Sequence, residues 1–171
     1  MAEIRSAAAA DMAIIHDLAH IIWPHAYLEI LSRDQVAYML RIMYNHDVLK
    51  ALEQRDDHKF LIASQKGLPV GFALYHPKIP TDISVYQLSK IYVHPLYQDK
   101  GIGKQILEYI IDNLQLLRVS TLELNVNRNN RAISFYQKLG FKITREVDLD
   151  IGNGYFMNDY VMEKSISFGL R

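Results

Sequence analysis

The chain has 171 residues, of which 50% are hydrophobic and 22% are charged, a composition typical of one globular domain. Nineteen basic residues balance nineteen acidic ones, so no overall positive charge indicates a nucleic-acid partner. Cysteine is absent, which excludes disulfides and thiol chemistry and is compatible with a reducing compartment.

The N-terminal segment carries Glu3 and Asp11 and lacks the continuous apolar core of a signal peptide. No stretch approaches the roughly 20 apolar residues that a membrane-spanning helix needs. We therefore expect residues 1–171 to form one cytoplasmic domain without a membrane or nucleic-acid partner, in which residues 166–171 are a short tail. The apolar segment Ile166–Leu170 permits a homodimer.

Hydrophobic periodicity and turn residues predict the elements in chain order. The first helix is expected to end at Pro24, and the second to begin after Ser32. The order is one strand, two or three helices, three strands, a helix, a strand, a helix and two strands. The strands are 2–6, 60–64, 70–75, 83–93, 121–126, 141–150 and 155–163. The helices are 10–22, a second helix that begins after Ser32 and turns apolar residues from Val36 to Met43 inward, then 47–55, 101–117 and 130–139.

The segment LSKIYVHPLYQDKGIGKQIL runs from Leu88 to Leu107 and combines an apolar strand with a glycine pair at the start of a helix. Glycines allow a tight turn and a close approach to a ligand. The free N–H groups of the first helical turn and the helix dipole favour an anion. The segment therefore predicts a site for a diphosphate.

Two common diphosphate motifs do not fit this segment. A P-loop requires glycine where Gln98 stands and serine or threonine where Gln105 stands. A Rossmann fingerprint requires a small residue where Ile106 stands. The pattern that remains, Gln98-x-x-Gly101-x-Gly103 after a strand, resembles the acetyl-CoA signature of the GNAT N-acetyltransferase superfamily.

A second block carries the same resemblance. The strand LELNVN, the pattern Asn129-x-x-Ala132-x-x-x-Tyr136 and the pair Gly140-Phe141 are similar to the second half of the GNAT core. The close match covers about residues 85–141. It implies an α/β fold of the GNAT type: a mixed, twisted central sheet of about seven strands, with helices on both faces and a splay between strands 4 and 5.

The resemblance also implies acetyl-CoA as co-substrate. Its pantetheine arm would lie along the fourth strand, where main-chain groups face it, and its pyrophosphate would bind the glycine segment. The expected cofactor-binding residues are Ile91, Val93, Gln98, Lys100, Gly101, Gly103, Lys104 and Asn129. The two lysines also fit solvated side chains, and Asn129 also fits a helix N-cap.

Acetyl transfer requires a neutral amine, a polarised carbonyl and a proton for the leaving thiolate. By resemblance, Tyr136 is the general acid, although a packing role would also explain it. Glu123 is the predicted catalytic carboxylate, but the sequence leaves its side-chain face undetermined. A water relay or Tyr92 is the alternative base, because the fourth strand offers no acid but only Gln87, Ser89 and Lys90.

Acceptor selection is expected in the loop between the first two helices and in the last hairpin. Both segments combine aromatic residues with carboxylates, which suits a cationic amine, although the rings could equally fill the core or a subunit interface. The expected substrate-binding residues are Trp23, Tyr27, Tyr155 and Asp159. Both segments look similar to those of small-molecule and polyamine acetyltransferases.

No metal is expected. His16 and His20 have the spacing of a zinc helix, but Asp17 replaces the usual glutamate and a solvated helix face explains them. The sequence thus predicts an acetyl-CoA-dependent N-acetyltransferase that acts directly on a primary amine of a small molecule, such as a polyamine or an amino acid derivative. The alternatives are a protein N-terminal or lysine acetyltransferase and a non-catalytic acyl-CoA sensor.

Overall fold

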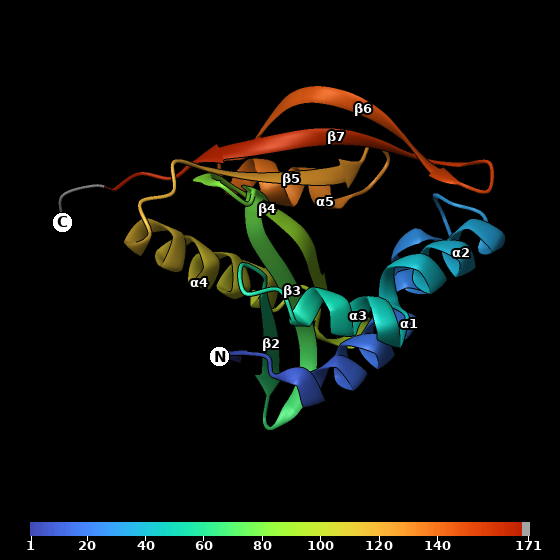
Figure 1. Cartoon of the computed structure of the whole chain (residues 1–171). Helices are drawn as coiled ribbons and strands as arrows, with labels where there is room; N and C mark the ends of the chain where they lie inside the picture. The colour runs from blue at the N-terminus through green and yellow to red at the C-terminus, as the bar shows by residue number, and fades with distance from the viewer. Residues whose placement is uncertain (169–171) are drawn as a thin grey trace.

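The computed structural model describes residues 1–168, in which seven strands form one mixed sheet with helices on both faces (Figure 1). The order across the sheet is β1-β2-β3-β4-β5-β7-β6, and the pair β4–β5 is parallel whereas all others are antiparallel. The strands are β1 (Glu3–Ser6), β2 (Lys59–Gln65), β3 (Leu68–Ile79), β4 (Asp82–Val93), β5 (Thr121–Asn127), β6 (Lys142–Gly152) and β7 (Tyr155–Ser165).

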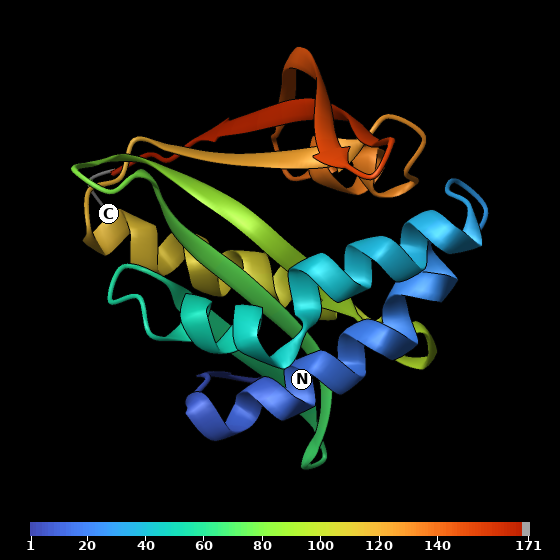
Figure 2. The ribbon, with the colours of Figure 1, turned by 45° about the vertical axis from the view of Figure 1, so that its right-hand side comes forward.

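Helices α1 to α3 cover one face, and α4 and α5 cover the other (Figures 1 and 2). Their bounds are α1 (Met12–Tyr27), α2 (Arg33–Tyr44), α3 (His46–Glu53), α4 (Ile102–Leu116) and α5 (Ala132–Lys138), with short 3-10 turns at Ala9–Asp11 and Pro95–Tyr97. None of the helices within residues 1–168 has the length and apolarity needed to cross a bilayer.

Side-chain caps begin two of the helices, with Ser32 before α2 and Asn45 before α3. The Ser32 hydroxyl accepts the Gln35 N–H at 3.1 Å, which confirms the predicted start of α2. The prediction that Pro24 ends the first helix is wrong, since α1 continues to Tyr27 and the Leu28 N–H still bonds the Pro24 carbonyl at 3.1 Å. Trp23 and Tyr27 are buried beside this turn, and their packing offsets the hydrogen bond that proline removes.

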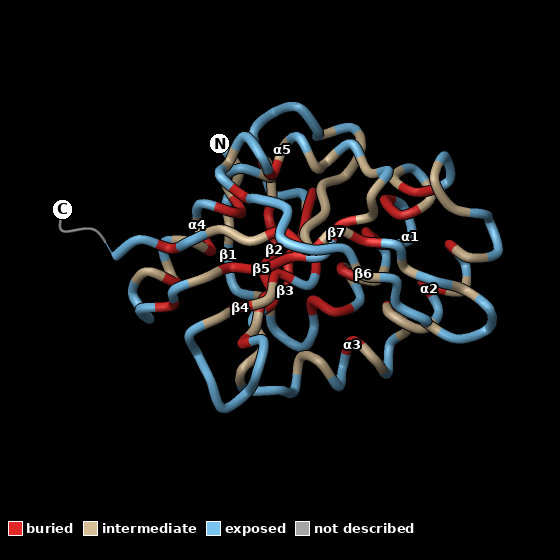
Figure 3. Tube along the Cα trace, turned by 90° about the horizontal axis from the view of Figure 1, so that it is seen from above, coloured by how far each residue is buried: buried red, intermediate tan, exposed pale blue. Residues whose placement is uncertain are grey.

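The core has two layers, one on each side of the sheet, and buried positions concentrate on the central strands (Figure 3). Helix α4 faces the sheet with an apolar stripe of Ile102, Ile106, Ile110 and Leu114, all of which are buried. Leu117 lies beyond the helix and is half exposed. In the second layer, Trp23 and its neighbours on α1 and α2 pack against β2 and β3.

The central strands separate part-way along their length. β4 and β5 pair only from Val85–Leu88 against Thr121–Leu124, whereas β4 continues beside β3 to Val93. Leu88 lies opposite Tyr75 on β3 and Lys90 opposite the preceding residue, so Ser89 is the extra residue of a β-bulge. Figure 2 shows the two halves of the sheet meeting at one end and diverging at the other. This confirms the predicted splay between strands 4 and 5.

The predicted single domain over residues 1–171 remains a prediction. Residues 169–171 of the expected C-terminal tail lie outside the described residues. Ile166, at the start of that tail, is buried, and its N–H donates to the Ser120 carbonyl at 2.8 Å. It therefore continues the core of the α4 face rather than projecting from it.

Candidate active site

The start of α4 presents unpaired amides at the open end of the splay. The first internal hydrogen bond of the helix joins the Gln105 N–H to the Gly101 carbonyl at 3.0 Å, which leaves the three amides before Gln105 without a helical partner. Gly101 has φ +79°, a left-handed conformation that favours glycine, and an added Cβ there would meet nothing within 4 Å. These residues can hold an anion such as a diphosphate.

The flanking residues fix this loop. The Gln98 side-chain amide donates to the Val93 carbonyl at 3.1 Å and so ties the loop to the end of β4. Lys100 lies 5.2 Å from the centre of the Tyr97 ring, and Lys104 faces Glu108 at 3.8 Å. Both lysines are exposed, so they add positive charge beside the amides without being buried there.

A cavity of about 600 Å³ lies on the opposite face of the sheet, beneath α1 and α2 and beside the splay. Its roof, from α1, α2 and the start of β7, is mainly apolar and aromatic, and its floor, from β3 to β7, combines polar side chains with Leu74, Leu88, Val147, Leu149 and Val161. The roof includes Trp23, Tyr27, Leu31, Met39, Met43, Phe156 and Met157, and the polar part of the floor includes His76, Lys78, Gln87, Ser89, Lys90, Glu123, Asn125, Asn127, Arg145 and Asp159. This division is typical of small-molecule sites.

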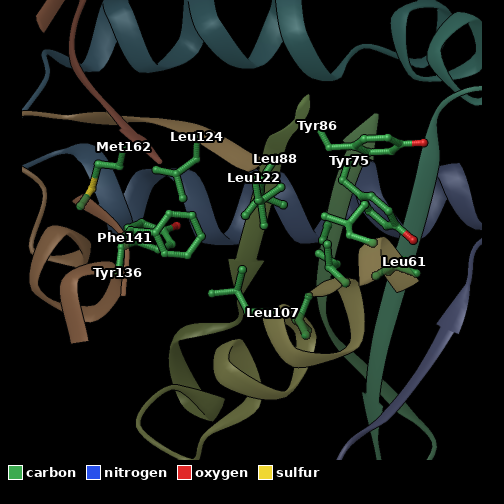
Figure 4. Packing of buried hydrophobic residues seen from close by; sticks show 14 of the residues in the cluster. Leu61, Tyr75, Tyr86, Leu88, Leu107, Leu122, Leu124, Tyr136, Phe141 and Met162 are labelled. Atoms are coloured by element: carbon green, nitrogen blue, oxygen red, sulfur yellow. The ribbon is translucent and has the colours of Figure 1, made fainter. Parts of the chain in front are cut away.

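The buried Tyr27 and Tyr136 and the partly buried Tyr92 lie near the splay. The hydroxyls of Tyr27 and Tyr92 are 2.8 Å apart, and burial raises the pKa of Tyr27 to about 12. Burial also raises the pKa of Tyr92 and of Tyr136, and the charge of Tyr27 adds to both effects. Tyr136 lies on α5 against Phe141, at 5.7 Å between ring centres (Figure 4). All three phenols therefore keep their protons at neutral pH.

Glu123 faces the floor of the cavity, which settles the orientation that the sequence left open. Its side chain is 4% exposed and forms two ion pairs, with Lys78 at 2.8 Å and with Arg145 at 3.2 Å. Each carboxylate oxygen therefore already has a cationic partner. The catalytic role of Glu123 stays a prediction.

Asp159 is a second carboxylate in the cavity, on β7 opposite Asn127. It is 3% exposed, and burial raises its pKa from 3.8 to about 6, although the charge of Arg128 and a hydrogen bond from Asn125 act against this. Its charge contributes to the raised pKa of Tyr27. Asp159 and Tyr27 thus belong to the same part of the cavity, and their role in substrate binding stays a prediction.

The bulge residue takes part in a polar pair that sequence reasoning missed. The Ser89 hydroxyl lies 2.6 Å from Nε2 of His76, and Nδ1 of that ring lies 2.8 Å from the Pro77 carbonyl. Because a carbonyl only accepts, the neutral ring carries its proton on Nδ1 and accepts from Ser89. Burial lowers the pKa of His76, so this neutral form prevails at pH 7. Only the pairing of β3 with β4 reveals the contact.

The other predicted residues are distributed as follows. Ile91 and Val93 direct their side chains to the α4 layer, while their main chain borders the splay. Asn129 is exposed, and the cap of α5 comes instead from Asn130, whose side chain accepts the Ala132 N–H at 2.8 Å. Trp23 lines the cavity. Tyr155 does not line it; its ring lies 5.2 Å from that of Tyr38 at the hairpin tip.

No cluster of three or more metal-ligating side chains occurs among residues 1–168. The ring of His16 lies 4.1 Å from that of His20 and 4.2 Å from that of His46, so the predicted decoy pair belongs to a stacked group. His20 Nδ1 bonds the His16 carbonyl at 2.7 Å. These contacts agree with a capping and stacking role on the helix surface.

Comparison with known sequences finds N-acetyltransferases among the relatives of this chain. A stretch of 55 residues is 46% identical to the [Ribosomal protein bS18]-alanine N-acetyltransferase of Escherichia coli strain K12, covering 32% of this chain and 37% of that protein. A stretch of 87 residues is 33% identical to the spermine/spermidine N(1)-acetyltransferase of Bacillus subtilis, covering 47% and 57%. The chain thus spans between about a third and somewhat over half of these relatives.

Solved structures match over nearly the whole chain. The PaiA N-acetyltransferase of Thermoplasma acidophilum, in complex with coenzyme A, superposes with a TM-score of 0.82 at 26% identity, covering 96% of this chain and 99% of that one. The E. coli S18-alanine enzyme gives a TM-score of 0.70 at 24% identity, a likeness of fold. The model described as "Acetyltransferase (GNAT) domain" matches residues 56–143, just over half of the chain. The chain therefore belongs to the GNAT acetyltransferase family.

Proposed function

We propose that this protein transfers the acetyl group of acetyl-CoA directly to a primary amine of a small molecule. One observation carries the proposal: the splay between β4 and β5 has the free amides of α4 at its mouth and a cavity of about 600 Å³ with polar side chains on its floor on the other side. A thioester held by the amides would reach an amine in the cavity through this gap.

The residues present fit coenzyme A. The left-handed Gly101 and the free first-turn amides suit a pyrophosphate, and the exposed Lys100 and Lys104 add charge beside it. Beyond Leu88, no strand among the described residues pairs with β4 on the side of the splay, so its main-chain groups are available to an extended pantetheine arm. The bound thioester supplies the acetyl group, and the relative from T. acidophilum binds the same coenzyme.

The chain's own groups supply the acid and base chemistry. Main-chain N–H groups around Ile91 polarise the carbonyl, an interaction worth roughly 3–4 kcal/mol per donor in other enzymes. Tyr136, whose raised pKa keeps it protonated, donates a proton to the departing sulfur. Asp159 accepts the proton of the ammonium, because a carboxyl with a pKa of about 6 is both ionised at pH 7.5 and more basic than an ordinary aspartate.

Glu123 was the catalytic carboxylate expected from the sequence. Because Lys78 and Arg145 already occupy its two oxygens, we propose that Glu123 holds the floor of the cavity. Direct transfer is favoured over an acetylated enzyme because the chain contains no cysteine.

Aromatic side chains over the cavity favour a small acceptor over a protein one. A protein N-terminus or lysine would need an open groove, whereas Trp23, Tyr27 and Phe156 roof this cavity. The bS18-alanine and spermine/spermidine relatives act on different acceptors, so kinship alone does not choose between them.

The test combines binding and turnover. Calorimetry should detect coenzyme A binding, and release of free CoA thiol from acetyl-CoA should depend on an added small amine. Binding without release on any small amine or peptide would favour the acyl-CoA sensor, and release with peptides alone would favour a protein acceptor. Absence of CoA binding would overturn the proposal.

A further inference from the structure

Lys90 is a buried cation that the proposed chemistry leaves unused. It is 6% exposed, lines the acceptor cavity, and its Nζ lies 4.1 Å from the centre of the Tyr44 ring. Among residues 1–168, no carboxylate lies within ion-pair distance of it and no hydrogen bond involves its ammonium group. Burial lowers its pKa to about 8, so most of it is still charged at pH 7.

The aromatic side chains near Lys90 form no hydrogen bond with its ammonium group. Trp23 Nε1 and the Tyr44 hydroxyl, both on the aromatic side, have no hydrogen-bond partner among the described residues. A π-face is a weak partner for an ammonium group that has lost most of its hydration. Burying an unpaired charge is costly, so buried ammonium groups in folded proteins normally have an ion-pair or hydrogen-bond partner. Lys90 has neither among the described residues.

The charges that line the cavity do not compensate Lys90 either. Glu123 is already balanced by two cations, and Asp159 is the remaining acid. The other titratable groups in the lining are Tyr27, His58, His76, Lys78, Tyr92 and Arg145. Lys78 and Arg145 pair with Glu123, and Arg145 also faces Glu163 at 3.8 Å, so among the described cations of the lining the unpaired positive charge is that of Lys90. A second ammonium group of a polyamine would be repelled there.

We propose that Lys90 binds a carboxylate of the acceptor, so that the substrate is an amine that also bears a carboxylate, such as an amino acid. This inference rests on the proposed function. The ammonium end points to Asp159 and Tyr27, where the acid and base chemistry lies, and the carboxylate end points to Lys90. Tyr92 connects the two ends, since it lies two residues from Lys90 on β4 and its hydroxyl bonds that of Tyr27.

Matched amines with and without a carboxylate test the proposal. We expect phenylalanine to exceed phenethylamine, and 4-aminobutanoate to exceed propylamine and spermidine, by about tenfold to hundredfold in kcat/KM, the range for one charged hydrogen bond. Lys90→Met keeps the apolar stem over the Tyr44 ring and should abolish this preference while sparing phenethylamine. Lys50→Met removes one exposed lysine of α3 outside the cavity and should preserve the preference.

Three results would overturn the inference. The first is a kcat/KM for spermidine that equals or exceeds that for 4-aminobutanoate, and the second is a carboxylate preference that survives Lys90→Met. The third is a loss of coenzyme A affinity in Lys90→Met, which would place Lys90 in the coenzyme site. If Lys90→Met does not fold, the wild type decides: phenylalanine should bind the CoA complex at least tenfold more tightly than phenethylamine in calorimetry, and equal affinities would overturn the inference. That comparison remains decisive even if no amine is acetylated, an outcome that counts against the proposed function alone.

Discussion

Asp159 is a carboxylate that the fold holds in an unfavourable place, so Asp159→Asn should stabilise the protein while it slows acetyl transfer. Burial raises its pKa from 3.8 to about 6. Between these two values the folded chain holds a proton that the unfolded chain has lost. The free energy of unfolding therefore falls as pH rises through this window, and the penalty is complete above about pH 7.

The size of the effect follows from the two pKa values. Each pH unit between them corresponds to about 1.4 kcal/mol, which sets an upper bound of about 3 kcal/mol. Since water can enter the cavity and screen the charge, we expect about 1–2 kcal/mol. Asparagine keeps the shape of the side chain without the charge, so Asp159→Asn should exceed the wild type by this amount at pH 8 and show no gain at pH 4.

Urea unfolding at pH 4, 6 and 8 measures the difference, and CoA-thiol release at pH 8 measures the rate. Asp11 gives a control of opposite sign: the Arg5 guanidinium, at 2.8 and 2.9 Å, lowers its pKa to about 2. Its contribution is present above pH 4 and is lost as pH falls toward 2, so Asp11→Asn should be less stable than the wild type at pH 8. The reasoning would be refuted if Asp159→Asn gained the same stability at pH 4 and pH 8, or if it were less stable than the wild type at pH 8. An unchanged rate of acetyl transfer would show that Asp159 is not the proton acceptor.

Three further changes separate the parts of the site. Tyr136→Phe should lower kcat by roughly 10²–10⁴-fold with CoA affinity intact in calorimetry, and an undiminished rate across pH would contradict its role as general acid. Gly101→Val and its control Gly67→Val replace glycines with φ of +79° and +80°, and each should lower the free energy of unfolding in urea by at least about 1–2 kcal/mol. Only Gly101→Val should also weaken CoA binding, by tenfold or more. Glu123→Gln should lower the unfolding midpoint, because two cations lose their partner, and change kcat by only a few fold; a loss as large as that of Tyr136→Phe would return the base role to Glu123.

The features that the sequence predicted well are those whose chemistry is local. A strand followed by Gly101 and Gly103 specifies a turn and a helix start within a few residues, and the structure has both. The stripe of α4 repeats every three to four residues and needs no partner to be recognised. Pro24 marks the limit of this reasoning, because its usual effect was overridden by the burial of Trp23, a tertiary contact that the local pattern does not contain.

The side-chain environment of the site was less accessible, because it depends on strand pairing. Glu123 could be assigned to a strand but not to a face, and its two cationic partners come from distant segments of β3 and β6. Tyr155 was expected in the acceptor site with Asp159, four residues further along the same strand, yet only Asp159 lines the cavity. The composition of the hairpin indicated that aromatic and acidic residues lie there, but it did not indicate which of them line the cavity.

The bulge at Ser89 explains why the sequence pattern did not place Lys90 in the cavity, although the structure does. In an unbroken strand, side chains two positions apart share a face, so Lys90 would follow Leu88 into the apolar layer under α4. The extra residue inverts the alternation: Leu88 stays opposite Tyr75, and Lys90 turns to the cavity face opposite Leu74. The parallel pairing of β4 with β5 ends at the same point. The inserted residue Ser89 thus lies where β4 separates from β5, which opens the sheet for the proposed thioester, and it also turns Lys90 toward the proposed acceptor cavity. A single bulge therefore links the coenzyme side of the proposed site to its acceptor side.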